Sequence, residues 1–327
     1  MKTARYYGIR DIRFEETEMP SCGPDEVLIR VEYAGICGSD LHIYNKGMFI
    51  MNIPETMGHE FVGTVAETGS LVRGFNKGEL VTANPMVPCM KCESCLAGSY
   101  NTCENLSFIG ECRQGCFAEY IVMNEKTLIR IPEGADVMCA ALTEPLAVAL
   151  NICKRAAFRP EDRVAVLGAG PIGLLTVMAA KALYGVRDIT AADLSEERLA
   201  LAEKIGASHT VKELVGSYDK VIDAAGVPAT FNSAVNHAKA NGSVFVVSIF
   251  EKSFESVINT VVAKQISVVG CNVYTAEEMK EAAEAIAAGK IDVRPLISRV
   301  YDITKCREAF EAAASADKKT AKILLKP

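Results

Sequence analysis

The sequence predicts an α/β protein that combines a β-rich part with a doubly wound parallel sheet. Two observations support this prediction. Short runs rich in Val, Ile, Tyr and Thr, separated by Gly and Pro, occupy roughly the first 140 residues, and from Asp162 onward apolar strands alternate with helical periods. The chain has 327 residues, 50% of them apolar, and is long enough for two domains that each have a core.

The β-rich part is recognised by its strand and turn residues. Strands are predicted at residues 27–33, 61–65 and 117–122, where β-branched and aromatic side chains concentrate. Ser-Cys-Gly-Pro at 21–24 and Asn-Pro at 84–85 interrupt the apolar runs, and such residues favour turns.

The second part shows the alternation expected of βαβ units, and strands joined through helices in this way form parallel sheets. It begins with a strand at 163–167, a glycine-rich turn, a helix at 172–183, a strand at 188–192, a helix at 196–205 and a strand at 220–224. The remaining predicted elements are a helix at 229–240, strands at 243–248 and 266–269, helices at 276–288 and 305–314, and a last strand at 321–325.

Composition argues against several classes of function. The 35 Lys and Arg against 41 Asp and Glu give a net charge of -6, so nucleic acid is not expected as a partner. The charged residues 1–16 lack the apolar core of a signal peptide, and no apolar run approaches the ~20 residues of a membrane span. We therefore expect a cytoplasmic protein without a membrane partner, whose 12 cysteines serve as thiolate ligands or buried thiols rather than disulfides.

The strongest motif is a run of closely spaced cysteines. Cys89, Cys92 and Cys95 follow a C-x-x-C-x-x-C pattern, and Cys103 comes shortly after them. Four thiolates so close together can surround Zn²⁺ at ~2.3 Å and leave no position open, as in structural zinc sites. The alternatives are an iron–sulfur cluster, which uses the same ligands, and a set of surface thiols.

A second, dispersed set of residues indicates a catalytic metal. Cys37 lies in a Gly-Ile-Cys-Gly-Ser-Asp-Leu-His segment, His59 in Gly-His-Glu, and Glu144 in Leu-Thr-Glu-Pro. A thiolate, an imidazole and a carboxylate would hold Zn²⁺ and leave its fourth position open to water or substrate. Taken singly, a buried Cys or a lone His is more often a core residue than a ligand. However, only 4 histidines exist, and His42 and His59 both lie in these glycine-containing segments.

A third motif indicates a dinucleotide. Gly168, Gly170 and Gly173 form a G-x-G-x-x-G pattern that follows a predicted strand and opens a predicted helix, and Asp193 ends the next predicted strand. The first glycine permits the tight turn, the second lets the backbone approach the pyrophosphate, and the third allows close packing of helix and strand. Asp193 would accept from the ribose hydroxyls of adenosine, or cap the helix that follows, or do both. The other predicted cofactor-binding residues are Pro171, Ile172 and Arg198.

Together these segments resemble the zinc-dependent medium-chain alcohol and polyol dehydrogenases, and most closely their sorbitol-dehydrogenase-like branch. The resemblance covers essentially the whole chain and includes Phe-Ile-Gly at 108–110, Phe-Ala-Glu-Tyr at 117–120 and Glu-Pro-Leu at 144–146. It implies a GroES-like, β-rich catalytic domain of residues 1–147 and 273–327, and a Rossmann domain of residues 148–272 that binds NAD. It also implies a homodimer or homotetramer.

The resemblance implies roles for individual residues as well. The alcohol dehydrogenases have a Cys as the third ligand of the catalytic zinc, whereas the polyol branch has a Glu, and this chain has Glu144 there. Glu60 would lie beside the metal and contact its water, and Asp40 would orient His59. The residues that match the family's proton relay are Ser39 and His42.

The chain departs from the family pattern in three places. The segment between His209 and Asp219 is about fifteen residues short, which predicts that one crossover helix of the Rossmann domain is lost or reduced. Cys116 replaces the second glycine before Phe-Ala. The Arg with which relatives hold substrate or water near residues 270–274 is missing.

These observations predict an NAD-dependent zinc dehydrogenase that oxidises a secondary alcohol of a neutral or phosphorylated polyol to a ketone. Within the family, the alternatives are a butanediol, threonine or sugar-acid dehydrogenase. The missing Arg ranks a sugar acid below a neutral polyol, or below one whose phosphate extends toward solvent and a peripheral lysine such as Lys46, because a buried anion needs a matching charge. Outside the family, the alternatives are a zinc-binding protein without turnover and a metal-free quinone reductase.

Overall fold

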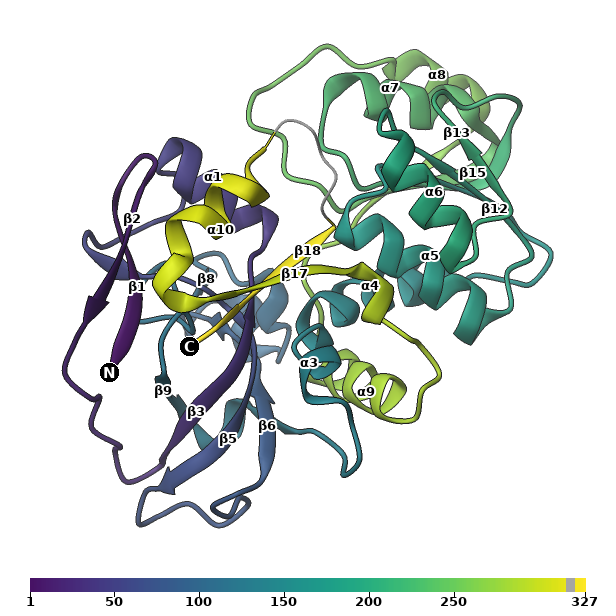
Figure 1. The fold of residues 1–327 in the computed structure, drawn as a ribbon. Coiled ribbons are helices and arrows are strands. Elements are labelled where there is room, and N and C mark those ends of the chain that lie inside the picture. Colours follow the sequence, from purple (N-terminus) through teal and green to yellow (C-terminus); the bar gives the residue numbers. More distant parts are fainter. Residues whose placement is uncertain (316–320) are drawn as a thin grey trace. The chain divides into compact units, whose positions relative to one another are not determined.

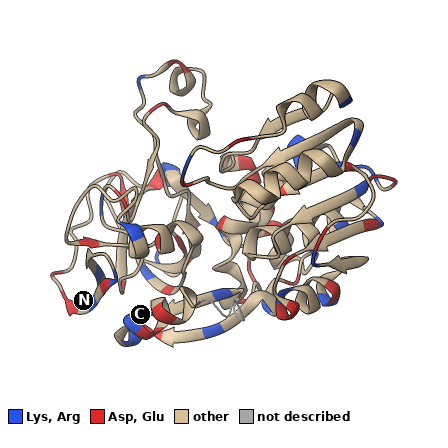
Figure 2. Cartoon of the chain, turned by 90° about the horizontal axis from the view of Figure 1, so that it is seen from above, with Lys and Arg blue, Asp and Glu red and all other residues tan. Residues whose placement is uncertain are grey.

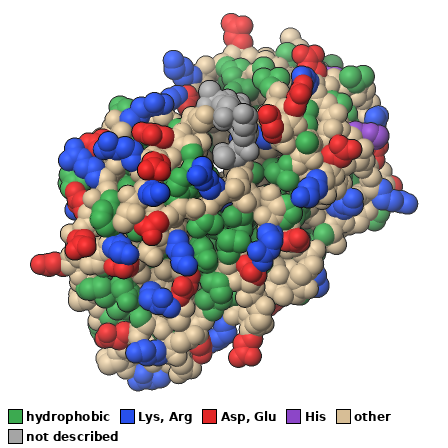
Figure 3. Space-filling model, in the orientation of Figure 1, with side chains coloured by type: hydrophobic (Ala, Val, Ile, Leu, Met, Phe, Trp, Pro, Cys, Tyr) green, Lys and Arg blue, Asp and Glu red, His purple; other side chains and the backbone are tan. Residues whose placement is uncertain are grey.

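A computed structural model describes residues 1–315 and 321–327, which form two compact units (Figure 1). The first unit contains Met1–Glu144, the described residues from Thr275 to Ser315, and Lys322–Pro327, and the second contains Pro145–Tyr274. Charged residues of both signs are distributed along the elements of each unit (Figure 2), and their side chains are interspersed on the face shown in Figure 3. None of the described helices is both long and apolar enough to cross a membrane.

The first unit is built on a mixed sheet whose strands come from distant parts of the sequence. Its strand order is β10-β6-β5-β3-β18-β17, and β9 also pairs with β3. β3 (Glu26–Gly35) runs antiparallel to both β5 (Glu60–Thr68) and β18 (Lys322–Lys326). The other strands of this sheet are β6 (Leu80–Ala83), β9 (Tyr120–Asn124), β10 (Leu128–Arg130) and β17 (Ile297–Asp302). Two smaller sheets contain β1 (Lys2–Gly8), β2 (Asp11–Glu16) and β4 (Glu55–Thr56), and β7 (Met86–Val87) and β8 (Ser107–Phe108).

Helices of the first unit close its core. α10 (Cys306–Ala313) packs against α1 (Gly38–Lys46), and its buried residues recur at helical spacing. The ring of Phe310 on α10 lies 5.2 Å from the Tyr44 ring and 5.8 Å from the Phe117 ring, and all three side chains are buried. The other helices of this unit are α2 (Glu93–Leu96), α3 (Val137–Ala140) and α9 (Ala276–Ala287).

The second unit contains six parallel strands in the order β13-β12-β11-β14-β15-β16, which is the 3-2-1-4-5-6 order of the Rossmann fold. The predicted parallel α/β sheet is confirmed. Helices α5 and α6 pack on β11 and β12 and on each other, as α7 and α8 do beside β15. The strands are β11 (Arg163–Leu167), β12 (Asp188–Ala192), β13 (His209–Val211), β14 (Tyr218–Asp223), β15 (Ala238–Val246) and β16 (Ser267–Gly270). The helices are α4 (Thr143–Ala156), which leads in from the first unit, α5 (Pro171–Tyr184), α6 (Glu196–Ile205), α7 (Pro228–His237) and α8 (Ile258–Lys264).

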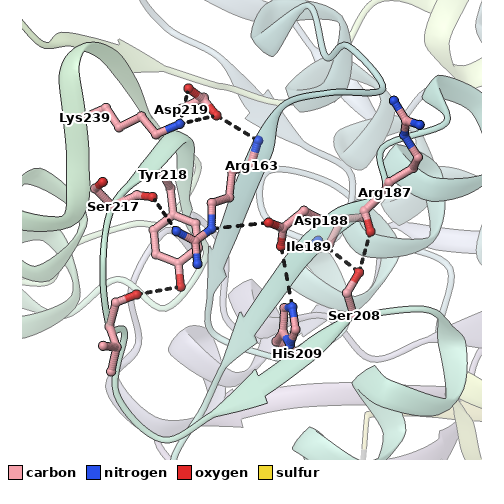
Figure 4. A network of polar contacts seen from close by, with 11 residues as sticks. Arg163, Arg187, Asp188, Ile189, Ser208, His209, Ser217, Tyr218, Asp219 and Lys239 are labelled. Atoms are coloured by element: carbon pink, nitrogen blue, oxygen red, sulfur yellow. Dashed lines mark hydrogen bonds and ion pairs between the residues drawn. The ribbon is translucent and has the colours of Figure 1, made fainter.

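Residues 212–217 connect β13 to β14, and these described residues form no helix. Arg163, at the start of β11, contacts the end of this connection (Figure 4). Its Nη1 donates to the Ser217 carbonyl at 3.3 Å, and its guanidinium lies 5.0 Å from the centre of the Tyr218 ring. Arg163 Nε also lies 3.3 Å from Asp188 Oδ2, at the start of β12. A polar network therefore fastens the segment where the shortened sequence predicts a lost helix.

Several predicted boundaries differ from the structure by one to a few residues, and pairing between strands accounts for two of these differences. The helix predicted to reach residue 240 ends at His237, and β15 begins at Ala238, because Ala238 pairs with Tyr218 and Lys239 Nζ binds both carboxylate oxygens of Asp219 at 2.8 and 2.9 Å. The strand predicted at 117–122 begins three residues later in the structure, as β9. Phe117, at the start of the predicted strand, bonds to β1 instead, because its carbonyl accepts from Ala4 N–H.

Candidate active site

Cys37 lies at the start of a short helix. It is the N-cap of α1, and the carboxylate of Asp40, three residues on, accepts a hydrogen bond from the Cys37 backbone N–H at 2.8 Å. A side chain that bonds back to the N-cap in this way fixes the start of a helix. Asp40 is only 1% exposed. The backbone of one predicted ligand is therefore held by a buried carboxylate.

His59 follows a glycine that the packing requires. Gly58 has a φ of 94°, and a Cβ at this position would lie 2.5 Å from the Phe117 ring, so only glycine permits this path of the chain. His59 is buried, and its Nδ1 lies 3.8 Å from Asp40 Oδ1. That oxygen has no hydrogen-bond partner among the described residues. Asp40 therefore touches the backbone of Cys37 with one oxygen and approaches the imidazole of His59 with the other.

Three side chains of this region form a group suited to a metal ion. The thiol of Cys37, a ring nitrogen of His59 and a carboxylate oxygen of Glu60 lie within 4.8 Å of one another. Sulfur, nitrogen and oxygen of these residue types are the donors that proteins offer to Zn²⁺. Glu60, expected beside the metal, thus offers a donor atom to the ligand group itself.

Glu144 lies near this group, although it is not a member of it within 4.8 Å among the described residues. It is buried in the first turn of α4. Burial lowers the pKa of His59, but the charges of Asp40, Cys37 and Glu144 outweigh burial and raise that pKa well above its usual range. An excess of negative charge around an imidazole is an environment that a divalent cation would neutralise.

A buried lysine that the motifs did not indicate completes the surroundings of Glu60. Lys322 on β18 donates to Glu60 Oε1 at 2.9 Å and Oε2 at 2.6 Å, and to the carbonyl of Ile36 at 3.1 Å. The side chains of Lys322 and Glu60 are 2% and 1% exposed. Lysine is almost never buried without a partner. The one signal in the sequence is a positive charge within the apolar strand predicted at 321–325.

Glu111 is a second buried ionisable residue, after Lys322, that the motifs did not indicate. Its backbone N–H donates to the Phe108 carbonyl at 3.2 Å, and its own carbonyl accepts from Met51 N–H at 2.8 Å. The Phe108 ring lies 6.0 Å from the ring of His59. Burial raises the pKa of Glu111 to about 7, against the lowering influence of His59. A carboxyl that titrates near neutral pH therefore lies in the turn beside the metal-ligand group.

Ser39 and His42, the predicted proton relay, lie three residues apart on α1 and so share a face of this helix. Both side chains are half-buried. The His42 ring meets the Phe49 ring edge-on, with 6.4 Å between the ring centres. Ser39 and His42 thus lie on the same helix as Asp40, within about one turn of Cys37. This position is compatible with a proton path that starts near the ligand group.

The four clustered cysteines are brought together as a separate group. The sulfur atoms of Cys89, Cys92, Cys95 and Cys103 lie within 4.8 Å of one another, around the short helix α2. Backbone N–H groups of Lys91 and Cys92 lower the pKa of Cys89 to about 6, whereas burial raises the pKa of Cys95 to about 12. Crowded sulfurs of this kind fit four thiolates around one zinc ion.

The glycine loop of the second unit has the geometry that dinucleotide binding requires. Gly168 has a φ of 95°, and a Cβ on Gly173 would overlap the Gly168 carbonyl oxygen, so both positions need glycine. Gly170 is the N-cap of α5, which leaves the first N–H groups of that helix open to an anion. Pro171 and Ile172 form its first turn, with Pro171 at a position that suits proline.

Backbone N–H groups hold the carboxylate of Asp193 beside the glycine loop. Its Oδ2 accepts from Ala169 N–H at 2.8 Å and its Oδ1 from Ser195 N–H at 2.9 Å, while Arg198 Nη1 lies 3.8 Å from Oδ2. The N-cap of α6 is Ser195, whose side chain accepts from Arg198 N–H, so Asp193 lies just before the cap. The carboxylate therefore stands beside the first turn of the glycine loop, with the guanidinium of Arg198 next to it.

Most of the chain matches known protein families. Residues 23–133 match the alcohol dehydrogenase GroES-like domain, and residues 171–288 match the zinc-binding dehydrogenase family. The sorbitol dehydrogenase of Bacillus subtilis (strain 168) is 32% identical over 346 residues, which cover 100% of this chain and 97% of that protein.

Solved structures match the chain over its whole length, which includes both units. Galactitol-1-phosphate dehydrogenase from Escherichia coli has a TM-score of 0.93 and 30% identity, with 100% of both chains covered. A protein from Sinorhizobium meliloti 1021, described as a zinc-binding dehydrogenase and bound to NADP, has a TM-score of 0.93 and 32% identity, with 100% of this chain and 99% of that chain covered. These matches confirm the predicted GroES-like and Rossmann fold class.

Proposed function

The chain belongs to the zinc-dependent medium-chain alcohol and polyol dehydrogenase family, and from this premise we propose that it oxidises a secondary alcohol of a polyol to a ketone with NAD as hydride acceptor. The observation that carries the proposal is the grouping of Cys37, His59 and Glu60 in one unit of a chain whose other unit holds a glycine loop fastened to Asp193. A metal-ligand group and a dinucleotide loop are the two parts that such a reaction requires.

In this proposal Cys37, His59 and Glu144 hold the catalytic zinc. The unpartnered Oδ1 of Asp40 and the raised pKa of His59 support a cation at this place. A zinc ion bound there supplies Lewis acidity, which lowers the pKa of an alcohol. Asp40 keeps the His59 ring in orientation, as carboxylates do for metal-bound imidazoles.

The chain's own residues move the proton. Ser39 and His42, which share a face of α1, carry the proton that the alcohol loses toward water. Histidine side chains in general exchange protons readily near neutral pH. The partial exposure of His42 lets the proton leave to water.

Two features of the chain favour a neutral polyol over a sugar acid. The family's Arg near residues 270–274 is missing, and the buried carboxyl of Glu111 would repel a carboxylate substrate once ionised. The relatives act on sorbitol and on galactitol 1-phosphate by their names. We therefore rank a neutral polyol, or one whose phosphate extends away from Glu111, above a butanediol, threonine or a sugar acid.

Asp193 favours NAD, because a carboxylate accepts from the free ribose hydroxyl and repels a 2′-phosphate. The group of Cys89, Cys92, Cys95 and Cys103 holds a second, structural zinc in this proposal. By the likeness to family members, the protein forms a homodimer or homotetramer. None of its 12 cysteines, all of which lie among the described residues, forms a disulfide, which suits the reducing cytoplasm.

Measurement of NADH absorbance and product chromatography test the function. Polyols, polyol phosphates, butanediol, threonine and a hexonate are supplied with NAD, and zinc is measured per chain. We expect a ketone from a polyol and zinc in both groups. Oxidation of the hexonate alone would overturn the substrate ranking. Zinc without turnover on any compound of the panel would favour the zinc-binding protein. Oxidation of NADPH by an added quinone in metal-free protein, with no turnover on the panel, would favour the quinone reductase.

A further inference from the structure

The turn that follows β8 packs directly against the backbone that leads into His59. Gly110 has a φ of 81°, and a Cβ at Gly110 would lie 2.6 Å from the Gly58 nitrogen, so only glycine permits this approach. The Phe108 carbonyl accepts from Glu111 N–H at 3.2 Å, which closes the turn. The backbone therefore fixes Glu111 beside the metal-ligand group.

Glu111 is a buried carboxyl whose charge the protein does not match with a lysine or arginine. It is 9% exposed, and the charged side chains that most affect its pKa are His59 and Asp40. None of the described lysines or arginines forms an ion pair with it. A buried carboxylate of this kind needs hydrogen-bond donors to be stable in its charged form.

Ser107, the first residue of β8, is a second buried polar residue at this place. It is 6% exposed, and its hydroxyl oxygen makes no hydrogen bond to a described residue. Ser107 lies near enough to Glu111 to lower the pKa of that carboxyl. Buried hydroxyls are normally hydrogen-bonded, so an unpaired one beside a buried carboxyl indicates a place for a ligand group.

The chemistry of the two side chains limits what this group can be. An ionised carboxylate only accepts hydrogen bonds, whereas a serine hydroxyl both donates and accepts. One ligand hydroxyl can therefore donate to Glu111 and accept from Ser107. A carboxylate or phosphate has no proton to donate and would meet the charge of Glu111, and an apolar group would leave both side chains unpaired.

We propose that Glu111 and Ser107 determine specificity by binding a second hydroxyl of the substrate, on the carbon next to the one that is oxidised. The Phe108 ring lies 6.0 Å from the His59 ring, so a hydroxyl held by this turn is close to one bound at the ligand group. The substrate is thus a vicinal diol within a polyol. The inference rests on the proposed function, in which the ligand group binds the reacting hydroxyl.

The test compares 2,3-butanediol, 2-butanol and 3-amino-2-butanol, which differ only in the group next to the reacting carbon. Calorimetric titration of the zinc-loaded protein with NADH present measures their Kd values, and no probe reacts because NADH cannot accept a hydride. We expect the wild type to bind the diol about 10- to 100-fold more tightly than 2-butanol, as for one hydrogen bond to a charged group. With NAD instead of NADH, the same pair gives the ratio of kcat/KM values.

Variants separate recognition of the hydroxyl from a general loss of structure. Glu111→Met is expected to bring the Kd ratio of diol and 2-butanol close to one, whereas Glu111→Gln keeps an acceptor and most of the preference. Ser107→Ala is expected to reduce the ratio about 2- to 10-fold. The double variant should fall no further than Glu111→Met, because both residues bind the same hydroxyl. The matched control is Thr190→Val, which removes a buried hydroxyl from β12 and should leave the ratio unchanged.

A wild type that binds 2-butanol as tightly as the diol would overturn the proposal. So would a Glu111→Met protein that keeps the wild-type ratio, and if this variant did not fold, Ser107→Ala would decide alone. Tighter binding of 3-amino-2-butanol than of the diol would assign the place to an ammonium and also refute a hydroxyl site. Failure of the proposed function appears separately, as the absence of NADH formation from every alcohol of the panel, whereas the Kd ratio is measured without turnover.

Discussion

Asp193 offers the sharpest test of cofactor choice. Its two oxygens are held at 2.8 Å by Ala169 N–H and at 2.9 Å by Ser195 N–H, and its side chain is 8% exposed. Asp193→Asn keeps the shape of the side chain, removes its charge and turns one acceptor into a donor. The substitution therefore removes the charge beside the glycine loop together with one of the two bonds from backbone N–H groups, because an amide nitrogen cannot accept.

The expected magnitudes follow from the charge and the hydrogen bonds. A hydrogen bond to a charged group contributes about 1.5–3 kcal/mol, so the loss of one bond to the ribose raises the Kd of NADH by about 10- to 100-fold. Repulsion between two unit charges at about 4 Å amounts to about 1 kcal/mol in water and about 4 kcal/mol at a protein surface. Its removal lowers the Kd of NADPH at least about fivefold.

Fluorescence titration of NADH and NADPH measures both constants without a substrate. The matched control is Asp188→Asn, which removes the same charge at the other end of β12, about 16 Å from Asp193 at 3.2–3.4 Å per residue. We expect the control to keep the wild-type ratio of the two Kd values. If Asp193→Asn also kept that ratio, the carboxylate would not select the cofactor and the reasoning would be refuted.

Further predictions concern the metals, the glycine loop and pH. Cys37→Ala or His59→Ala is expected to abolish turnover in a folded protein that retains about one zinc per chain, as metal analysis and circular dichroism can check, and a fully active Cys37→Ala protein would exclude the assignment. Cys92→Ala is expected to lose the other zinc and to lower the Tm, because closed thiolate sites stabilise the fold, and an unchanged Tm would contradict this. Gly173→Ala is expected to abolish NADH binding, since its Cβ overlaps the Gly168 carbonyl oxygen, and an unchanged Kd for NADH would show that the loop adapts. Between the ordinary pKa of 4.5 and the folded-state pKa of about 7, folded Glu111 retains a proton that the unfolded chain has lost, so wild-type stability falls as pH rises through this interval. Glu111→Gln should reduce this fall in urea unfolding curves, and an equal fall in both proteins would be inconsistent with the raised pKa.

Local patterns were sufficient for much of the second unit. The strands at 163–167 and 188–192 and the helix at 196–205 match β11, β12 and α6 to the residue, because apolar runs and the helical period mark their limits within a few positions. The N-cap of α6 is Ser195 and not Asp193, the residue that the sequence analysis offered as the cap. The boundary between α7 and β15 could not be placed in this way. It depends on pairing with Tyr218 and on the ion pair between Lys239 and Asp219.

Motif spacing was sufficient to select the residues that the structure groups, but it did not reveal their surroundings. Cys37 and His59 are indicated by their glycine-containing segments and Glu60 by the family resemblance, and the ligand role of Glu144 stays a prediction. Lys322 and Glu111 were not selected. The partner of Lys322 is 262 positions away in the sequence, and the burial of Glu111 depends on a turn that packs beside His59. No local sequence pattern therefore indicates either residue.

The late position of β18 in the sequence has a consequence for the order in which the protein matures. During synthesis Cys37, His59 and Glu60 leave the ribosome long before Lys322, which follows the whole second unit. Until β18 has been synthesised, the ammonium partner of Glu60 is missing, so a chain that ends before Lys322 would bury this carboxylate without a matching charge. The first unit therefore completes its charge balance only after the whole second unit has been synthesised.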